Sequence, residues 1–176
     1  REKRNENDNC PFVLFVRTLD GGGSEKTLSP REVMGMFVGS WNSEMTYMFG
    51  DDPAKYQVRK MTSVLKWSPE KHFVLEQVNT GRVWVLTYDP TKKKHRLVVI
   101  LPETTIILYG SWDDAQKSMS WQGHDDDGNR LKGYHRVLDK DHHEWELSVS
   151  KADQLSYRLA GKQKRRINPG NQAIAD

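Results

Sequence analysis

The stretch that decides the fold is Arg82–Gly123, which reads RVWVLTYDPTKKKHRLVVILPETTIILYGSWDDAQKSMSWQG. Three turn-like segments, Tyr88–Lys93, Leu101–Glu103 and Trp112–Lys117, divide it into four short runs rich in Val, Ile, Trp and Tyr. These residue types suit a pleated, half-buried surface, and no part of the stretch has the spacing of an amphipathic helix. The stretch therefore predicts consecutive strands of an antiparallel meander.

The same pattern of short strands and turns continues on both sides of this stretch. Turn signals rich in Asp, Gly, Asn and Pro separate further runs of apolar and aromatic residues. The additional strands expected are Ser40–Phe49, Lys55–Lys66, His72–Val78, Arg130–Leu138, His143–Ser150 and Gln154–Arg166.

Two strands near the C-terminus show which face is buried. In each of them every second residue is apolar and the residues between are polar or small, which is typical of an antiparallel sheet with one buried and one wet face. The residues expected to face inward are Trp145, Leu147, Val149, Leu155, Tyr157 and Leu159.

Closure of the sheet follows from the number of strands. About ten strands in one small domain favour a closed sheet, because closure removes the unpaired edges of an open one. We therefore predict an all-β fold, an up-and-down antiparallel β-barrel of about 8–10 strands, with one short N-terminal helix.

The short helix is predicted from a start signal before the first barrel strand. Ser29 is a suitable N-cap, Pro30 suits the first helical position, and Glu32 completes a capping box. Gly39 is expected to end the helix. The apolar residues at one-face helical spacing are Val33, Met34, Phe37 and Val38.

Composition excludes several classes of protein. The 176 residues carry a net charge of +3, with the basic residues partly clustered at the ends, and this predicts no nucleic-acid partner. Cys10 is the only cysteine, so an internal disulfide is excluded. No apolar run approaches the ~20 residues of a membrane span, and no segment has the flanks of a signal peptide, so a soluble protein of unknown compartment is expected.

The domain organisation follows from the same signals. Residues 1–28 are predicted to be a flexible lead and linker with one extra strand possible at Phe12–Leu19, residues 29–166 to be the barrel, and residues 167–176 to be a disordered tail. Because the chain begins at Arg1 rather than Met, we expect a trimmed product or a piece of a longer polypeptide.

The motif Val38-Gly39-Ser40-Trp41, placed after a short helix at the start of the first barrel strand, resembles the Gly-x-Trp motif of lipocalins in the calycin superfamily. The chain is also similar to lipocalin-like bacterial domains of unknown function. The segments that carry this second likeness, between about Pro30 and Arg166, are Leu86–Pro90, Gly110–Asp113, Met119–Gly123, His135-Arg136 and Glu144-Trp145.

The resemblance implies a barrel of eight to ten strands, with a short helix near one mouth, and no particular activity. In lipocalins an Arg of the last strand stacks over the Gly-x-Trp indole, so the resemblance implies a structural closure of the barrel end at Trp41. The candidates for this Arg are Arg158, Arg165 and Arg166, of which we favour Arg165.

Aromatic residues dominate the candidate ligand site. The six tryptophans either fill the interior or line a cavity, and polar residues on inward faces favour a partly open, amphiphilic cavity. The predicted ligand-binding residues are Trp84, Trp112, Trp121, Glu76, His135 and Tyr157.

Cofactor and catalytic motifs are sparse. The calycin group includes haem-binding barrels, and an inward-facing His135 could ligate haem iron. The alternative is a histidine that only forms hydrogen bonds. No other cofactor is expected. Asp125–Asn129 lacks the glycine position and closing Glu of a calcium loop, so no metal site is predicted. Nucleophile and phosphate-loop motifs are absent from the sequence, so the protein is not expected to be an enzyme.

Three functional hypotheses remain open. The first is a non-enzymatic calycin-like barrel that binds a small apolar or amphiphilic ligand. The second is a ligand-free accessory interaction domain of a larger protein, suggested by the missing Met and by the Gly21–Gly23 linker. The third is a haem-binding barrel through His135. The sequence leaves the ligand's identity and the oligomeric state open.

Overall fold

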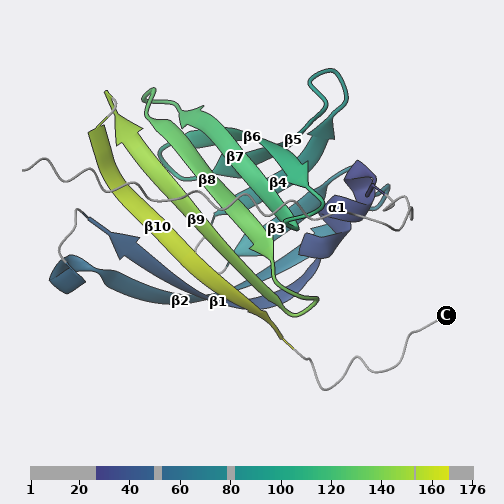
Figure 1. Cartoon of the computed structure of the whole chain (residues 1–176), viewed down its shortest axis with the longest axis horizontal. Coiled ribbons are helices and arrows are strands. Elements are labelled where there is room, and N and C mark those ends of the chain that lie inside the picture. Colours follow the sequence, from purple (N-terminus) through teal and green to yellow (C-terminus); the bar gives the residue numbers. More distant parts are fainter. Residues whose placement is uncertain (1–26, 50–52, 79–81, 153, 167–176) are drawn as a thin grey trace, which may run out of the picture.

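Within the residues that the computed structural model describes, 27–49, 53–78, 82–152 and 154–166, ten antiparallel strands close into one barrel. The predicted all-β, up-and-down barrel with one short helix is confirmed (Figure 1). Each strand pairs with its neighbours in the chain, and β1 pairs with β10 to close the sheet. The strands are β1 (Gly39–Met48), β2 (Gln57–Trp67), β3 (Val74–Val78), β4 (Val83–Asp89), β5 (Lys94–Ile100), β6 (Thr105–Asp113), β7 (Ser118–Asp125), β8 (Arg130–Val137), β9 (His142–Lys151) and β10 (Gln154–Arg165).

Some predictions concern other parts of the chain. The lead at 1–26, including the extra strand considered at Phe12–Leu19, and the tail at 167–176 lie outside the described residues. Parts of the turns predicted at Gly50–Pro53 and Asn79–Gly81 also lie outside them.

The helix α1 (Pro30–Phe37) lies across one end of the barrel (Figure 1). Ser29 accepts a hydrogen bond from the backbone N–H of Glu32, and the Glu32 carboxylate accepts one from the N–H of Ser29, which completes the capping box. The helix ends at Phe37, two residues before the Gly39 stop predicted from the sequence, and Gly39 instead begins β1. Its apolar face packs into the barrel core through Val33, Met34 and Phe37.

Strand ends differ from the predicted ends where local hydrogen bonds compete with the sheet. The short 3₁₀ helix η1 (Pro53–Lys55) delays the start of β2 to Gln57. The turn before β3 is held by a backbone hydrogen bond from Ser68 N–H to the Phe73 carbonyl at 2.8 Å, so β3 begins at Val74 rather than at His72.

The inward face of the barrel follows the predicted alternation except at one position. Trp145, Leu147 and Val149 follow it along β9, and Tyr157 and Leu159 follow it on β10. A register shift between Leu155 and Tyr157 breaks the alternation, and Leu155 is 51% exposed. The prediction that Leu155 faces inward was wrong because the extra residue of a bulge reverses the face of the residues before it.

Glycines make room for tryptophans on the inward face. A Cβ at Gly161 would lie 2.4 Å from the ring of Trp145, its partner on β9, and a Cβ at Gly110 would lie 2.5 Å from the ring of Trp121 on β7. Each indole therefore lies over a glycine of the adjacent strand, which brings large rings into a narrow barrel.

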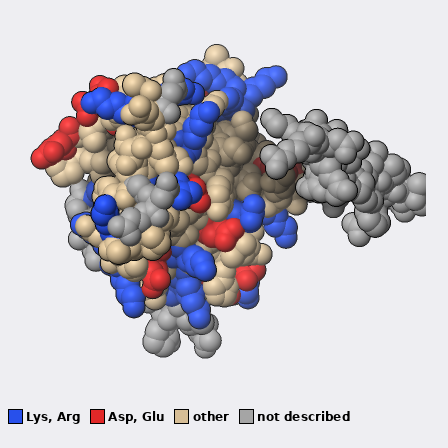
Figure 2. Space-filling model, turned by 60° about the vertical axis from the view of Figure 1, so that its left-hand side comes forward, with Lys and Arg blue, Asp and Glu red and all other residues tan. Residues whose placement is uncertain are grey.

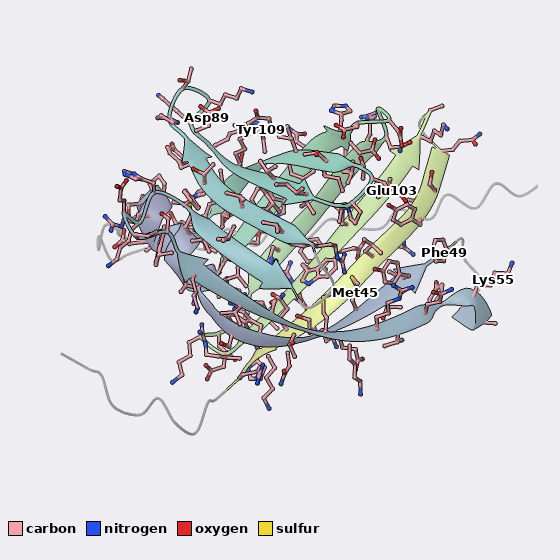
Figure 3. The ribbon with its side chains drawn as sticks, turned by 180° about the vertical axis from the view of Figure 1, so that it is seen from behind. Met45, Phe49, Lys55, Asp89, Glu103 and Tyr109 are labelled. Atoms are coloured by element: carbon pink, nitrogen blue, oxygen red, sulfur yellow. The ribbon has the colours of Figure 1, made fainter. Side chains whose placement is uncertain are left out.

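The two ends of the barrel differ. Figure 3 shows Asp89 and Tyr109 together at one end of the sheet and Phe49 and Lys55 at the other. Phe49, 44% exposed, packs there against Tyr157 with ring centroids 5.9 Å apart, whereas α1 covers the opposite end. Figure 2 shows both signs of charge interspersed over the face that it draws.

Candidate functional site

A small cavity lies inside the barrel beneath α1. Its volume is about 80 Å³, below the roughly 300–1,000 Å³ of pockets that hold drug-sized ligands but several times the space of one water molecule. Every strand and the helix contribute to its wall. The lining side chains are Phe37, Trp41, Leu65, Glu76, Trp84, Leu86, Leu97, Leu108, Trp121, Tyr134, His135, Trp145, Glu146, Leu147 and Gln163.

The composition of this wall is suited to an apolar molecule with a polar group. Leucine and tryptophan side chains form most of it, because inward positions on consecutive strands carry one apolar residue after another. Glu76 from β3 and Trp84 from β4 stand directly opposite each other in the register, and both residues line the cavity.

Glu76 is a carboxyl group in apolar surroundings. It is 5% exposed, and burial raises its pKa above 4.5, an effect partly offset by the Ser63 hydroxyl and the charge of Arg82. Burial disfavours the charged form because the carboxylate loses its hydration. Glu76 therefore keeps its proton to higher pH than a surface glutamate does, and when protonated it can donate a hydrogen bond into the cavity.

Trp84 brings a hydrogen-bond donor that has no acceptor. Its Nε1 is fully buried, and no described residue accepts its proton. Leaving such a group unpaired costs about 1–3 kcal/mol relative to a satisfied donor. An acceptor on a bound molecule, or a trapped water, would remove that cost.

We expect Glu76→Gln to stabilise the protein at alkaline pH. Because the folded-state pKa lies above the unfolded value, the stability linked to Glu76 is present at low pH and is lost as pH rises through the folded pKa. The amide never ionises, so the free energy of unfolding should rise by about 1 kcal/mol at pH 8 and change little at pH 4. Urea unfolding at both pH values measures the effect.

Glu44→Gln, on the exposed outer face of β1, is the matched control and should leave stability unchanged at both pH values. A loss of stability at pH 8 in Glu76→Gln would contradict the assignment of a buried carboxyl whose charged form is disfavoured.

Two histidines pack between the cavity and α1. His135 Nε2 and His143 Nδ1 are 3.2 Å apart, and the ring of Phe37 meets His135 edge-on at 4.8 Å. Burial lowers the pKa of His135 to about 3, with a smaller contribution from His143, and burial lowers the pKa of His143 to about 4, with a smaller contribution from Arg165. Both rings are therefore neutral near pH 7.

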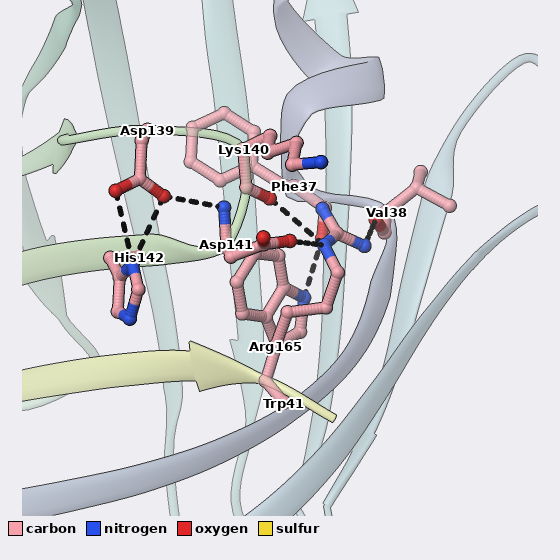
Figure 4. Close-up of polar contacts among 8 residues, drawn as sticks. All are labelled: Phe37, Val38, Trp41, Asp139, Lys140, Asp141, His142 and Arg165. Carbon is pink, nitrogen blue, oxygen red and sulfur yellow. Dashed lines mark hydrogen bonds and ion pairs between the residues drawn. The ribbon is translucent and has the colours of Figure 1, made fainter. Parts of the chain in front are cut away.

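Trp41 and Arg165 tie the helix to the closing strands (Figure 4). The Trp41 indole N–H donates to the Phe37 carbonyl at 3.0 Å, and the Arg165 guanidinium lies 4.3 Å from the Trp41 ring. Arg165 also donates to the Val38 carbonyl at 3.0 Å. A Cβ on Gly39 would lie 2.1 Å from Arg165 Nη1, so the guanidinium reaches its position only past a glycine.

The other two Arg candidates lie elsewhere. Arg158 pairs with Met48 in the register between β10 and β1, at the far end of β1 from Trp41. Arg166 contributes its backbone N–H to the Ser40 carbonyl at 2.7 Å. Of the three, Arg165 is the one whose side chain is placed over the indole.

The structure brings together four of the six residues predicted to bind a ligand. Glu76, Trp84, Trp121 and His135 line the cavity, and Trp41 also reaches it. Trp112 and Tyr157 do not line it. The indole N–H of Trp112 is bound to Asp114 Oδ1 at 2.8 Å at the end of β6.

Tyr157 belongs to the opposite end of the barrel. There it packs near Phe49, and its pKa is raised mainly by burial and further by the charges of Asp125 and Tyr47. This position separates it from the cavity beneath α1.

Sequence reasoning missed most of the cavity wall. Most of its additional residues are apolar and carry no motif, and the alternation along each strand could have identified those that share an inward face with an inward-facing residue already predicted, such as Leu86 with Trp84. The additional residues are Phe37, Leu65, Leu86, Leu97, Leu108, Tyr134, Trp145, Glu146, Leu147 and Gln163.

The cavity does not fit a haem group. About 80 Å³ is well below the roughly 300–1,000 Å³ of pockets for ligands of that class, and the Nε2 of His135 faces His143 Nδ1 rather than open space. Among the described residues, no three His, Cys, Asp or Glu side chains are grouped so that they could hold a metal ion. The described part of the chain also contains no helix with the length and apolar character needed to cross a membrane.

Comparisons with known proteins identify the fold and no family. No protein-family model matches the chain, and no curated protein matches its sequence. Among solved structures, a protein of unknown function from the DUF3598 family of Nostoc punctiforme is similar over 75% of this chain and 48% of its own, with a TM-score of 0.51 and 8% identity. The present chain thus spans about half the length of that protein.

An S-type phycobiliprotein lyase from Guillardia theta is similar over 80% of this chain and 94% of its own, with a TM-score of 0.51 and 11% identity. At these identities the likeness shows a shared barrel fold alone, and it fits the lipocalin-like architecture expected from the sequence.

Proposed function

We propose that the protein is a non-enzymatic binding barrel whose interior holds a small, mostly apolar molecule with one hydrogen-bond acceptor. The observation that carries this proposal is the unpaired, buried indole N–H of Trp84, in the wall of an apolar cavity and opposite Glu76. Buried donors without partners are rare in native proteins, and one on a residue that lines a cavity supports a site whose acceptor comes from a ligand.

The chemistry of the wall defines the ligand class. Leucine and tryptophan side chains favour a hydrocarbon or aromatic body, while Trp84 N–H and a protonated Glu76 both donate toward an acceptor such as a carbonyl oxygen. The volume of about 80 Å³ restricts the buried part to a few heavy atoms. The phycobiliprotein lyase has a similar barrel fold, and this likeness of fold is the only support that it gives to the proposal.

The proposal is tested with two ligands that differ in one group. Acetophenone and ethylbenzene have nearly the same shape, but only acetophenone carries a carbonyl acceptor. We expect acetophenone to bind about fivefold more tightly, because one net hydrogen bond contributes about 1 kcal/mol. Isothermal titration calorimetry with the purified chain measures both affinities.

Two tryptophan variants isolate the donor. Trp84→Phe removes the unpaired N–H and should bind both ligands equally, whereas Trp112→Phe removes an N–H already bound to Asp114 and should keep the preference. Failure of both ligands to bind the wild-type chain, or a preference that survives Trp84→Phe, would overturn the proposal.

A further inference from the structure

A basic groove crosses the outer surface of four neighbouring strands, β5 to β8, away from the interior cavity. Its volume is about 670 Å³, and none of the side chains that line it is acidic. Tyr109 forms part of its floor. The basic and amide residues that line it are Lys92, Lys94, Gln122, His124, Arg130 and Lys132.

Charge is segregated on this side of the barrel. Leu97, Trp121 and Leu131 point into the core, so the residues that alternate with them on β5, β7 and β8 face outward. None of these outward positions carries Asp or Glu. β5, β7 and β8 therefore present positive charge without interspersed carboxylates, and on β6 the outward Asp113, at the end of the strand, does not line the groove.

The edges of the groove carry two further relevant groups. Asp89 lies opposite Lys94 in the register, and its carboxylate accepts hydrogen bonds from the turn amides of Thr91 and Lys92, each at 3.0 Å. Arg96 lies directly opposite Tyr109, and its buried Nε has no hydrogen-bond partner among the described residues. The Arg96 guanidinium adds a further positive charge beside the groove.

The spacing of the cations suits a chain with repeated negative charges. Strands lie about 4.8 Å apart, so cations on β5 and β8 are separated by roughly 14 Å. Lys94 and Lys132 thus stand on opposite sides of the groove. In a sheet the backbone amides are already paired with neighbouring strands, so no cluster of free N–H groups is available to surround a single small anion.

The aromatic residues of this face disfavour a nucleic acid. Lys92 Nζ lies 3.9 Å from the centre of the Tyr109 ring, and the Arg136 guanidinium lies 5.5 Å from that of Tyr134. A cation already occupies one side of each ring, where an unpaired base would otherwise stack. Carboxylates need no such surface and pair directly with Lys and Arg.

We infer that this groove binds an acidic segment of a partner protein, an extended stretch rich in Asp and Glu. Lys94 and Lys132 supply the charges on its two sides, the Lys92 ammonium lies over Tyr109 of β6 between them, and Arg96 stands on β5 opposite Tyr109. The site is independent of the interior cavity, so either can exist without the other.

The test uses a fluorescein-labelled peptide of ten glutamates and fluorescence anisotropy in low salt. We expect saturable binding that weakens as ionic strength rises toward about 0.15 M, where charges are screened beyond about 8 Å. Lys94→Glu with Lys132→Glu should weaken binding at least tenfold, since both contacts become repulsive. Circular dichroism verifies that each variant keeps its strand content.

A matched double variant distinguishes weaker binding caused by changes in the groove from weaker binding caused by the change in net charge. Lys60→Glu with Lys162→Glu changes the charge by the same amount on the outer faces of β2 and β10, in a groove that also contains Glu44 and Asp139, and should weaken binding less than twofold. Equal weakening by the two double variants overturns the inference. So does the absence of peptide binding, or tighter binding of a labelled ten-nucleotide single strand.

Discussion

Trp41→Ala should lower the free energy of unfolding by about 3–5 kcal/mol, the range measured when large buried aromatic residues are truncated. Trp41 is 1% exposed, its N–H holds the Phe37 carbonyl, and its ring packs against Arg165 and against His143 at 4.3 Å. The truncation leaves a cavity between the helix and the closing strands and frees the last carbonyl of α1. Urea unfolding at pH 7 measures the loss.

Two further variants keep this prediction testable even where Trp41→Ala does not fold. Trp41→Phe retains an aromatic ring but loses the N–H, and should cost about 1–2 kcal/mol. Arg165→Ala should cost about 1–2 kcal/mol through the lost contact with the indole. In a double-mutant cycle the losses from Trp41→Phe and Arg165→Ala should be non-additive, because the two side chains touch. Additive losses would show that the stacked pair does not act as a unit.

Acid should destabilise the barrel through His135 and His143. Their folded-state pKa values, about 3 and about 4, lie below the ordinary value of 6.5, so the unfolded chain takes up protons first as pH falls. Stability from the neutral pair is fully present above pH 6.5 and is lost as pH falls from 6.5 toward 4. The expected loss is a few kcal/mol, since one pKa unit corresponds to about 1.4 kcal/mol.

The variant His135→Gln with His143→Gln removes this titration. Its free energy of unfolding should change less between pH 7 and pH 4.5 than that of the wild type, while His124→Gln, on the exposed outer face of β7, should follow the wild type. Urea unfolding at several pH values provides the comparison. Parallel profiles for the wild type and the double variant would refute the assignment of the pair as buried and neutral.

Much of the fold could be predicted because local signals and global architecture agree. The Ser29 cap and Pro30 predict where α1 begins, and the turns in Arg82–Gly123 separate strands that the structure also separates. The errors occur where a local interaction is invisible in the pattern, such as the bulge before Tyr157. A bulge reverses which residues of a strand face inward, but it leaves no mark in the types of residue. The alternation of apolar and polar residues alone therefore cannot locate it.

The candidate site was less predictable than the fold. The alternation of side chains along a strand shows that Trp84 and Trp112 both occupy inward positions. It does not show how far along the barrel axis each one lies. That position depends on the stagger between strands, which is a property of the closed sheet. Trp112 lies at the end of β6 with its N–H bound to Asp114, and Tyr157 lies at the other end of the barrel.

The central claim is that Trp84 N–H meets an acceptor on a ligand inside the barrel, and a ¹H–¹⁵N spectrum of the six tryptophan indoles tests it most directly. With the signals assigned through Trp→Phe variants, acetophenone is added to the wild-type chain. We predict a saturable downfield shift of the Trp84 Nε1–H signal while that of Trp112, already bound to Asp114, stays in place. A Trp84 signal that does not move at saturating acetophenone, or a Trp112 signal that moves as far, would contradict the account.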